Sequence, residues 1–327
     1  MFTNLLRYII ILTILGKCLS ITNKSSKIEI DIVPRVVRGF PAKLGDVPYQ
    51  VAFKALASRT TQSYLTFCGG TIVGPTKILS AAHCFVEDKS ACAKIFFKRG
   101  RVQKKELRNK FAVAATLYNK GYKPESDDTP EGQWRKLKEV YYPAKYKFPK
   151  KDIAIVFTKT PFIYNKYVNE IPYASRYADY QGKCLVSGYG RITNVGKQKS
   201  NKLLLAHLEI VPYRHCNRHY KKNMHAFVCT SSMVTDVGKG DSGGPLVCMK
   251  TGDPNEQSKG ILVGVVSGHR TGVGSFFTRV SNYYKYIERN KSCTNDKSYF
   301  IYLYLAILIQ HRFLLFSFSF IVYSLPL

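Results

Sequence analysis

The chain has 327 residues, of which 45% are hydrophobic, so it can bury a large core, and a wholly disordered chain is excluded. Lysine and arginine total 50 against 21 acidic residues, a formal net charge of +29. This excess favours acidic partners such as sulfated glycans, anionic membrane surfaces, nucleic acid or acidic proteins. A solvated basic surface without a dedicated ligand is the alternative.

The first twenty residues have the pattern of a cleaved signal peptide. Arg7 precedes an apolar run from Tyr8 to Gly16, and the segment ends in small residues at Ser20. The run is shorter than the roughly 20 apolar residues that a membrane-spanning helix needs. We therefore expect cleavage and export rather than an uncleaved anchor.

Eight of the nine cysteines remain once Cys18 is removed with residues 1–20. An even set without a C-x-x-C pair, in an oxidising compartment, indicates disulfides rather than a metal site. The eight are Cys68, Cys84, Cys92, Cys184, Cys216, Cys229, Cys248 and Cys293. No metal and no cofactor are implied.

Residues 21–35 form a short polar segment, predicted to be a propeptide, and an ordered domain is expected from residue 36 to residue 293. Its apolar segments are short and bounded by Gly, Pro and Asn, which is typical of strands. The one helical pattern runs from Ser281 to Lys291, with Ser281 as its N-cap. The domain should be mainly β, built as barrels or a sandwich.

Residues 294–327 form an apolar tail of unknown role, in which Gln310-His311-Arg312 interrupts two apolar runs. A lipid-anchor signal, a tilted span and a mistranslated extension are the alternatives. The interruption would lie in the middle of the membrane and cost several kcal/mol in a single span. An anchor signal should have a polar spacer where the first apolar run lies. We expect no functional span.

Residues 240–245, with the sequence GDSGGP, carry the strongest chemical signal. Their glycines allow a tight turn that presents the Ser242 hydroxyl and directs backbone N–H groups outward. A serine becomes a good nucleophile only beside a base that is itself oriented by an acceptor. His83, in LSAAHC, and Asp152, which opens the apolar segment DIAIV, are the candidates.

These three stretches, in the order His, Asp, Ser, resemble the chymotrypsin/trypsin family of serine peptidases over about residues 36–291. The resemblance implies an all-β fold of two packed six-stranded β-barrels with a C-terminal helix. It also implies a catalytic triad of His83, Asp152 and Ser242, with an oxyanion hole from the backbone N–H groups of Gly240 and Ser242. Peptide bonds would be cut through an acyl-enzyme.

The resemblance also implies a zymogen. Val36-Val37-Arg38-Gly39 stands where the family has Ile-Val-Gly-Gly, so cleavage after Arg35 by an activating protease would free the Val36 amine to pair with Asp241. Arg38 departs from the pattern by replacing a glycine. The alternative for Arg35 is an ordinary surface arginine.

Three disulfides follow from the family's spacing, Cys68–Cys84, Cys184–Cys248 and Cys216–Cys229. Cys92 and Cys293 are left over. We expect them to pair with each other, although sequence alone does not fix their connectivity.

Asp236 stands where the family places the base of its primary specificity pocket, and an aspartate there selects Arg or Lys. The pocket wall departs from the family, because Gly238 replaces a cysteine and Ser267-Gly268-His269 replaces the usual Ser-Trp-Gly. We expect cleavage after Arg or Lys. A solvated loop carboxylate is the alternative for Asp236.

A basic insertion between His83 and Asp152 would border the active-site cleft and could restrict substrates or bind a polyanion; simple solvation is the alternative. It contains Lys94, Lys98, Arg99, Arg101, Lys104, Lys105, Arg108 and Lys110. Expected partners are thus protein or peptide substrates and an activating protease, with a polyanion on the basic surface as a further candidate, and no nucleic acid is expected. The alternative function is a non-catalytic protease homologue acting as a basic binding module, which the intact triad argues against.

Overall fold

The computed structural model divides the chain into two units, residues 1–33 and 34–327, and everything described below belongs to the second. The described residues are 39–86, 100–102, 104–129, 132–190, 199–231, 237–238, 240–270 and 273–290. The predicted signal peptide, propeptide and apolar tail lie outside them. So do Arg35, Val36, Cys92, Asp236 and Cys293.

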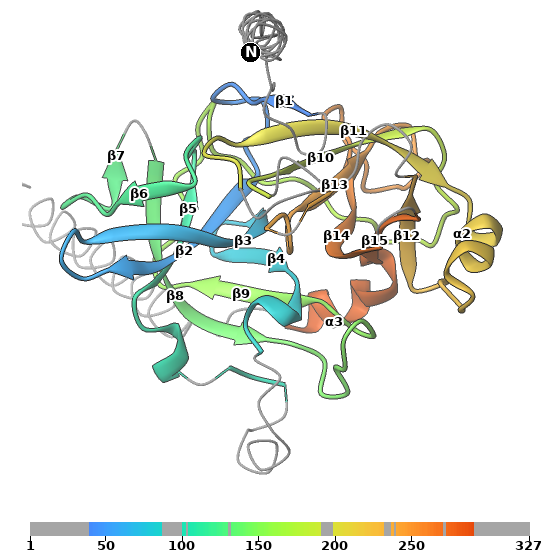
Figure 1. The fold of residues 1–327 in the computed structure, drawn as a ribbon, viewed down its shortest axis with the longest axis horizontal. Helices are drawn as coiled ribbons and strands as arrows, with labels where there is room; N and C mark the ends of the chain where they lie inside the picture. The colour runs from blue at the N-terminus through green and yellow to red at the C-terminus, as the bar shows by residue number, and fades with distance from the viewer. Residues whose placement is uncertain are drawn as a thin grey trace, which may run out of the picture. The chain divides into compact units, whose positions relative to one another are not determined.

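The first half of the domain closes into an antiparallel barrel of six strands (Figure 1). Pairing of β2 with β3 closes the ring, and the short strands β6 (Lys120–Tyr122) and β7 (Asp128–Thr129) lie outside it. The ring, in order, is β2 (Gln50–Ser58), β5 (Lys110–Ala114), β8 (Gly132–Tyr141), β9 (Ala154–Thr158), β4 (Lys77–Ser80) and β3 (Ser63–Gly74). β9 (AIVFT) is buried along its whole length, as expected for an apolar strand at the centre of a core.

The second half closes in the same way, through pairing of β11 with β12. This ring is β11 (Leu204–Val211), β10 (Lys183–Gly188), β13 (Pro245–Cys248), β14 (Ile261–Arg270), β15 (Gly274–Arg279) and β12 (Phe227–Thr230). The short strand β1 (Phe40–Pro41) pairs with β11 outside the ring. Each barrel has a core of its own.

A further apolar cluster joins the two barrels. It contains Leu79 and Ile155 from the first barrel, Leu205 and Val265 from the second, and Ile287 from the C-terminal helix. The predicted fold of two packed six-stranded β-barrels with a C-terminal helix is thereby confirmed. The apolar packing between the barrels also fixes the junction at which the site described below is built.

The helices differ from the sequence-based expectation. The C-terminal segment starts as a 3-10 turn, η4 (Val280–Tyr283), and the α-helix α3 covers only Tyr284–Arg289, so Ser281 lies inside the turn instead of capping the helix. The helix α2 (Tyr213–Tyr220) was not predicted, because its sequence is largely polar and only Cys216 is buried. In the described part of the chain, no helix has the length and apolar character needed to cross a membrane.

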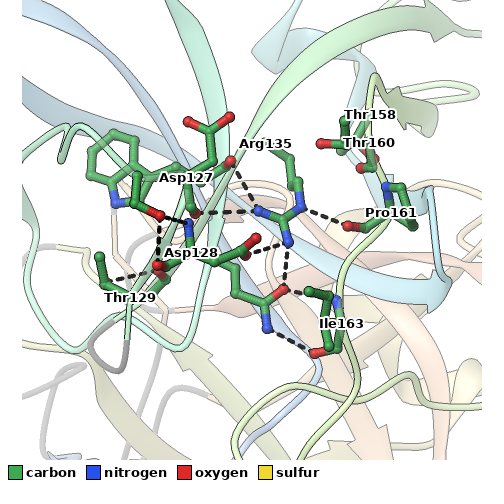
Figure 2. A network of polar contacts seen from close by, with 12 residues as sticks. Asp127, Asp128, Thr129, Arg135, Thr158, Thr160, Pro161 and Ile163 are labelled. Carbon is green, nitrogen blue, oxygen red and sulfur yellow. Dashed lines mark hydrogen bonds and ion pairs between the residues drawn. The ribbon is translucent and has the colours of Figure 1, made fainter.

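The first barrel encloses the guanidinium of Arg135, which projects from β8 and is 2% exposed (Figure 2). Its Nε donates to the Pro161 carbonyl at 2.6 Å, Nη1 to the Asp127 carbonyl at 3.2 Å and Nη2 to Asp128 Oδ1 at 2.5 Å. A buried charge without such partners would be strongly destabilising. Arg135 therefore fastens the segment around β7 and the segment after β9 to the barrel.

Candidate active site

His83 lies in a single 3-10 turn, η1 (Ala82–Cys84), directly after β4. Its backbone N–H donates to Asp152 Oδ1 at 2.9 Å, and its Nδ1 lies 2.7 Å from Asp152 Oδ2. A carboxylate only accepts, so Nδ1 is the protonated nitrogen and Nε2 keeps a lone pair. The side chain is 25% exposed, which leaves this lone pair available as a base.

Asp152 lies two residues before the start of β9 and is completely buried. Ser267 on β14 donates its hydroxyl to Asp152 Oδ2 at 2.6 Å, and Thr278 on β15 donates to the Asp152 backbone carbonyl at 2.7 Å. Both come from the second barrel, so Asp152 is held across the junction. From the sequence, Ser267 was expected only in the wall of the specificity pocket, and no role was predicted for Thr278. Contacts between strands so distant in the chain leave no local signal.

Ser242 occupies the turn before β13. Gly240 and Gly243 have positive φ angles, 120° and 78°, which glycine adopts without strain. The Ser242 carbonyl accepts the N–H of Gly69 at 2.8 Å, and a Cβ on Gly243 would lie 2.3 Å from Ser80 Oγ. The turn is thus pressed against β3 and the end of β4, which leads into His83.

The Ser242 hydroxyl forms no direct hydrogen bond with His83 among the bonds of the described residues. Catalytic hydrogen bonds often tighten only when substrate binds. The three residues are therefore gathered at one junction, with the His83–Asp152 half of the constellation already bonded.

Asp241 is also buried, with 1% of its surface exposed. Its Oδ1 accepts the Gly190 N–H at 2.7 Å and its Oδ2 the Gly238 N–H at 2.8 Å. A Cβ on Gly188 or Gly190 would lie 2.0 or 2.2 Å from the nearest carboxylate oxygen, so glycine is needed at both positions. The carboxylate thus ties the Ser242 turn to Gly238, just before it, and to Gly190, in the segment after β10.

Three disulfides stabilise the domain, Cys68–Cys84, Cys184–Cys248 and Cys216–Cys229, the same pairs that the resemblance implies. Cys68–Cys84 ties β3 to the residue after His83. Cys68, His83 and Cys84 also lie close enough together to suggest metal ligands. Since the two sulfurs are bonded to each other, they are not free thiolates, the form in which cysteine binds metal.

Phe148 is a site residue that the sequence analysis missed. Its ring is 50% exposed and meets His83 edge-on, with 5.6 Å between ring centroids and 83° between planes. It lies at the tip of a small hairpin in which Lys147 and Lys150 pair, just before Asp152. A substrate that passes over His83 would meet this ring.

Comparison with known proteins places this architecture in a family. The family model "Trypsin" matches residues 36–287. Complement factor I of Rattus norvegicus is 32% identical over 269 residues, which cover 77% of this chain and 38% of that protein. The venom peptide isomerase heavy chain of Agelenopsis aperta is 27% identical over 274 residues, which cover 78% of this chain and 99% of that protein. Trypsin-3 of Salmo salar is 26% identical over 265 residues, which cover 79% of this chain and 93% of that protein.

The chain belongs to the trypsin family of serine proteases, since the family model covers most of it. It spans only part of some relatives, including 38% of complement factor I and 16% of the ovochymase of Halocynthia roretzi. The trypsin family is a family of serine endopeptidases.

Proposed function

We propose that His83, Asp152 and Ser242 are the catalytic residues of this serine endopeptidase. The observation that carries the proposal is the buried chain of hydrogen bonds from Ser267 to Asp152 to His83, at 2.6 and 2.7 Å. These hydrogen bonds orient the imidazole of His83 so that its Nε2 is free to accept a proton.

His83 Nε2 takes the Ser242 proton as Oγ attacks the peptide carbonyl, and then gives it to the leaving amine. The Asp152 carboxylate stabilises the imidazolium without taking its proton. The N–H groups of Gly240 and Ser242 receive the oxyanion, in a turn whose conformation depends on glycine at 240 and 243. Water then hydrolyses the acyl-enzyme.

Secretion as a zymogen is part of the proposal. Three disulfides favour an oxidising, extracellular compartment, and the signal-peptide pattern of residues 1–20 agrees with export. Cleavage after Arg35 by an activating protease would release a Val36 amine for the buried Asp241 carboxylate. The burial of that carboxylate, directly against the backbone of Gly188 and Gly190, supports this role.

The proposal of cleavage after Arg or Lys rests on Asp236. The described part of the pocket wall affects how well such substrates fit. A Cβ on Gly268 would lie 2.2 Å from the Phe276 ring, so this part of β14 is closely covered by an aromatic side chain. A changed wall can weaken affinity, while a buried carboxylate still selects for a cation.

Labelling with a fluorophosphonate probe tests the mechanism. The wild type should become labelled after cleavage at Arg35, and Ser242→Ala should not; Ser242→Ala and His83→Ala should each lower kcat by about 10⁶. Arg35→Gln should be secreted but stay inactive. Near-normal turnover by Ser242→Ala would end the proposal, and an unlabelled but correctly cleaved wild type would favour a non-catalytic binding module.

Matched peptides that differ only in Arg, Lys, Phe or Leu before the scissile bond test specificity. Arg and Lys should be preferred, and Asp236→Ser should abolish that preference. Equal cleavage of the Phe and Leu peptides by the wild type would exclude Asp236 as the selector.

A further inference from the structure

A cavity of about 380 Å³ opens on the first barrel, away from the residues proposed for catalysis. Residues 55–57 of β2 form one side, residues 108–110 at the start of β5 form the other, and Arg59 follows the end of β2. Ala55 is the register partner of Lys110, and the Leu56 N–H donates to the Asn109 carbonyl at 3.3 Å. Paired backbone therefore holds the two sides at a fixed separation.

Three cations line this cavity, Arg59, Arg108 and Lys110, and no carboxylate is among its described lining residues. None of the three forms an ion pair with another described residue. Other arginines of the same barrel do, since Arg101 pairs with Glu139 and Arg135 with Asp128. The Lys110 ammonium lies 5.4 Å from the centre of the Phe67 ring, but no described carboxylate neutralises any of the three cations.

We propose that this cavity binds the sulfate groups of a sulfated oligosaccharide. Guanidinium groups match tetrahedral oxyanions with two parallel hydrogen bonds, and two arginines face one space here. The volume lies at the lower end of the range for ligand pockets, which suits a short saccharide segment. The net charge of +29 would attract such a chain from a distance.

The donors in the lining favour a sulfated sugar over an acidic peptide. Arg59, Arg108, Lys110 and Asn109 offer many donor groups, whereas Asn109 is the one side chain of the described lining that can accept. A peptide brings a backbone N–H at nearly every residue and needs matching acceptors, while sulfate oxygens only accept. A sulfated sugar therefore suits the lining better.

The cavity is separate from the proposed active site. Gly69, which bonds the Ser242 carbonyl, is the register partner of Ala52, and Ala55 is three residues further along β2. At about 3.3 Å per residue, this separation is about 10 Å along the strand. The inference does not depend on peptidase activity.

The test measures binding of a heparin-derived octasaccharide to the full chain at several salt concentrations, with its desulfated form and a polyglutamate peptide as competitors. Arg59→Ser combined with Arg108→Ser should raise the Kd at least tenfold and flatten its salt dependence. The matched control is Arg214→Ser with Arg218→Ser on α2, which removes the same charge from two exposed arginines outside the cavity. The control should change the Kd less than twofold.

Equal weakening by the two double variants would overturn the proposal, because binding would then follow net charge alone. Competition by polyglutamate as strong as that of the octasaccharide would overturn it in favour of an acidic protein partner. Unchanged melting temperatures and unchanged cleavage of a short peptide exclude misfolding as the cause of a lost affinity.

Discussion

Asp152 and Lys54 are both completely buried in the first barrel, but their charges are compensated in different ways. The Asp152 carboxylate accepts from two side chains and one backbone amide, and one of these side chains is the titratable ring of His83. The Lys54 ammonium donates only to the backbone carbonyls of Tyr118, at 2.5 Å, and Asn119, at 2.8 Å, among the described residues.

The partner, and not burial alone, decides what a buried charge can do. Asp152 can take part in proton transfer, because the imidazole ring of His83 that it orients can accept and release a proton. Lys54 faces neutral dipoles, and burial lowers the pKa of its ammonium from an ordinary 10.5 to about 7. Lys54 ties the segment at residues 118–119 to β2, and it does so with a charge that is lost near neutral pH.

Among these buried residues, the largest effect should come from replacing Asp152, the acceptor of the site. Asp152→Asn retains the shape but offers His83 a donor as well as an acceptor, which allows the wrong imidazole tautomer. We expect kcat to fall by about 10⁴ with little change in melting temperature. Steady-state kinetics on the activated enzyme measures this.

The control is Asp127→Asn, at a half-exposed carboxylate that pairs with Lys123. It should leave kcat within twofold of the wild type. A loss of tenfold or less in Asp152→Asn would show that Asp152 does not orient the base.

Replacing Lys54 should instead change how stability depends on pH. Because the folded pKa of Lys54 lies below the unfolded value, the unfolded chain binds more protons between pH 7 and pH 10.5, and stability must rise with pH in that window. From pH 7 to pH 9 this adds about 2 kcal/mol to the free energy of unfolding. Well below pH 7 the contribution no longer changes, since both states are protonated.

Lys54→Met should remove this rise. Urea unfolding can be followed by the fluorescence of Trp134, the single tryptophan, which is buried. The Ser242→Ala background prevents self-digestion during the measurement. If the Lys54→Met variant gains as much stability from pH 7 to pH 9 as the protein that keeps Lys54, the titration belongs to another group.

The contrast between Asp152 and Lys54 also shows how much of the fold and of the site could be predicted from the sequence. Asp152 is recognisable because a local motif surrounds it, and the two-barrel fold follows from the same motifs. Lys54 alternates with the apolar Val51, Phe53 and Ala55 along β2, so its position predicts an exposed side chain. Closure of the barrel buries both faces of the strand there, and only the tertiary structure reveals it.

The same limit applies to the partners of the site. Ser267 lies 115 residues from Asp152, and Phe148 reaches His83 through the fold of a hairpin. Neither contact has a sequence pattern, whereas the three disulfides and the glycine turn around Ser242 do. Long-range contacts that position the chemistry were therefore the part that could not be predicted.

The smallest effect should come from Ser267→Ala, which removes one hydrogen bond from Asp152 Oδ2 and leaves both bonds from His83. A hydrogen bond to a charged group is worth about 1.5 kcal/mol or more, so we expect kcat to fall about tenfold with KM unchanged. Thr71→Val, which removes a buried hydroxyl without a hydrogen-bond partner among the described residues, is the control and should change neither quantity. An unchanged kcat in Ser267→Ala would mean that Ser267 only packs against Asp152.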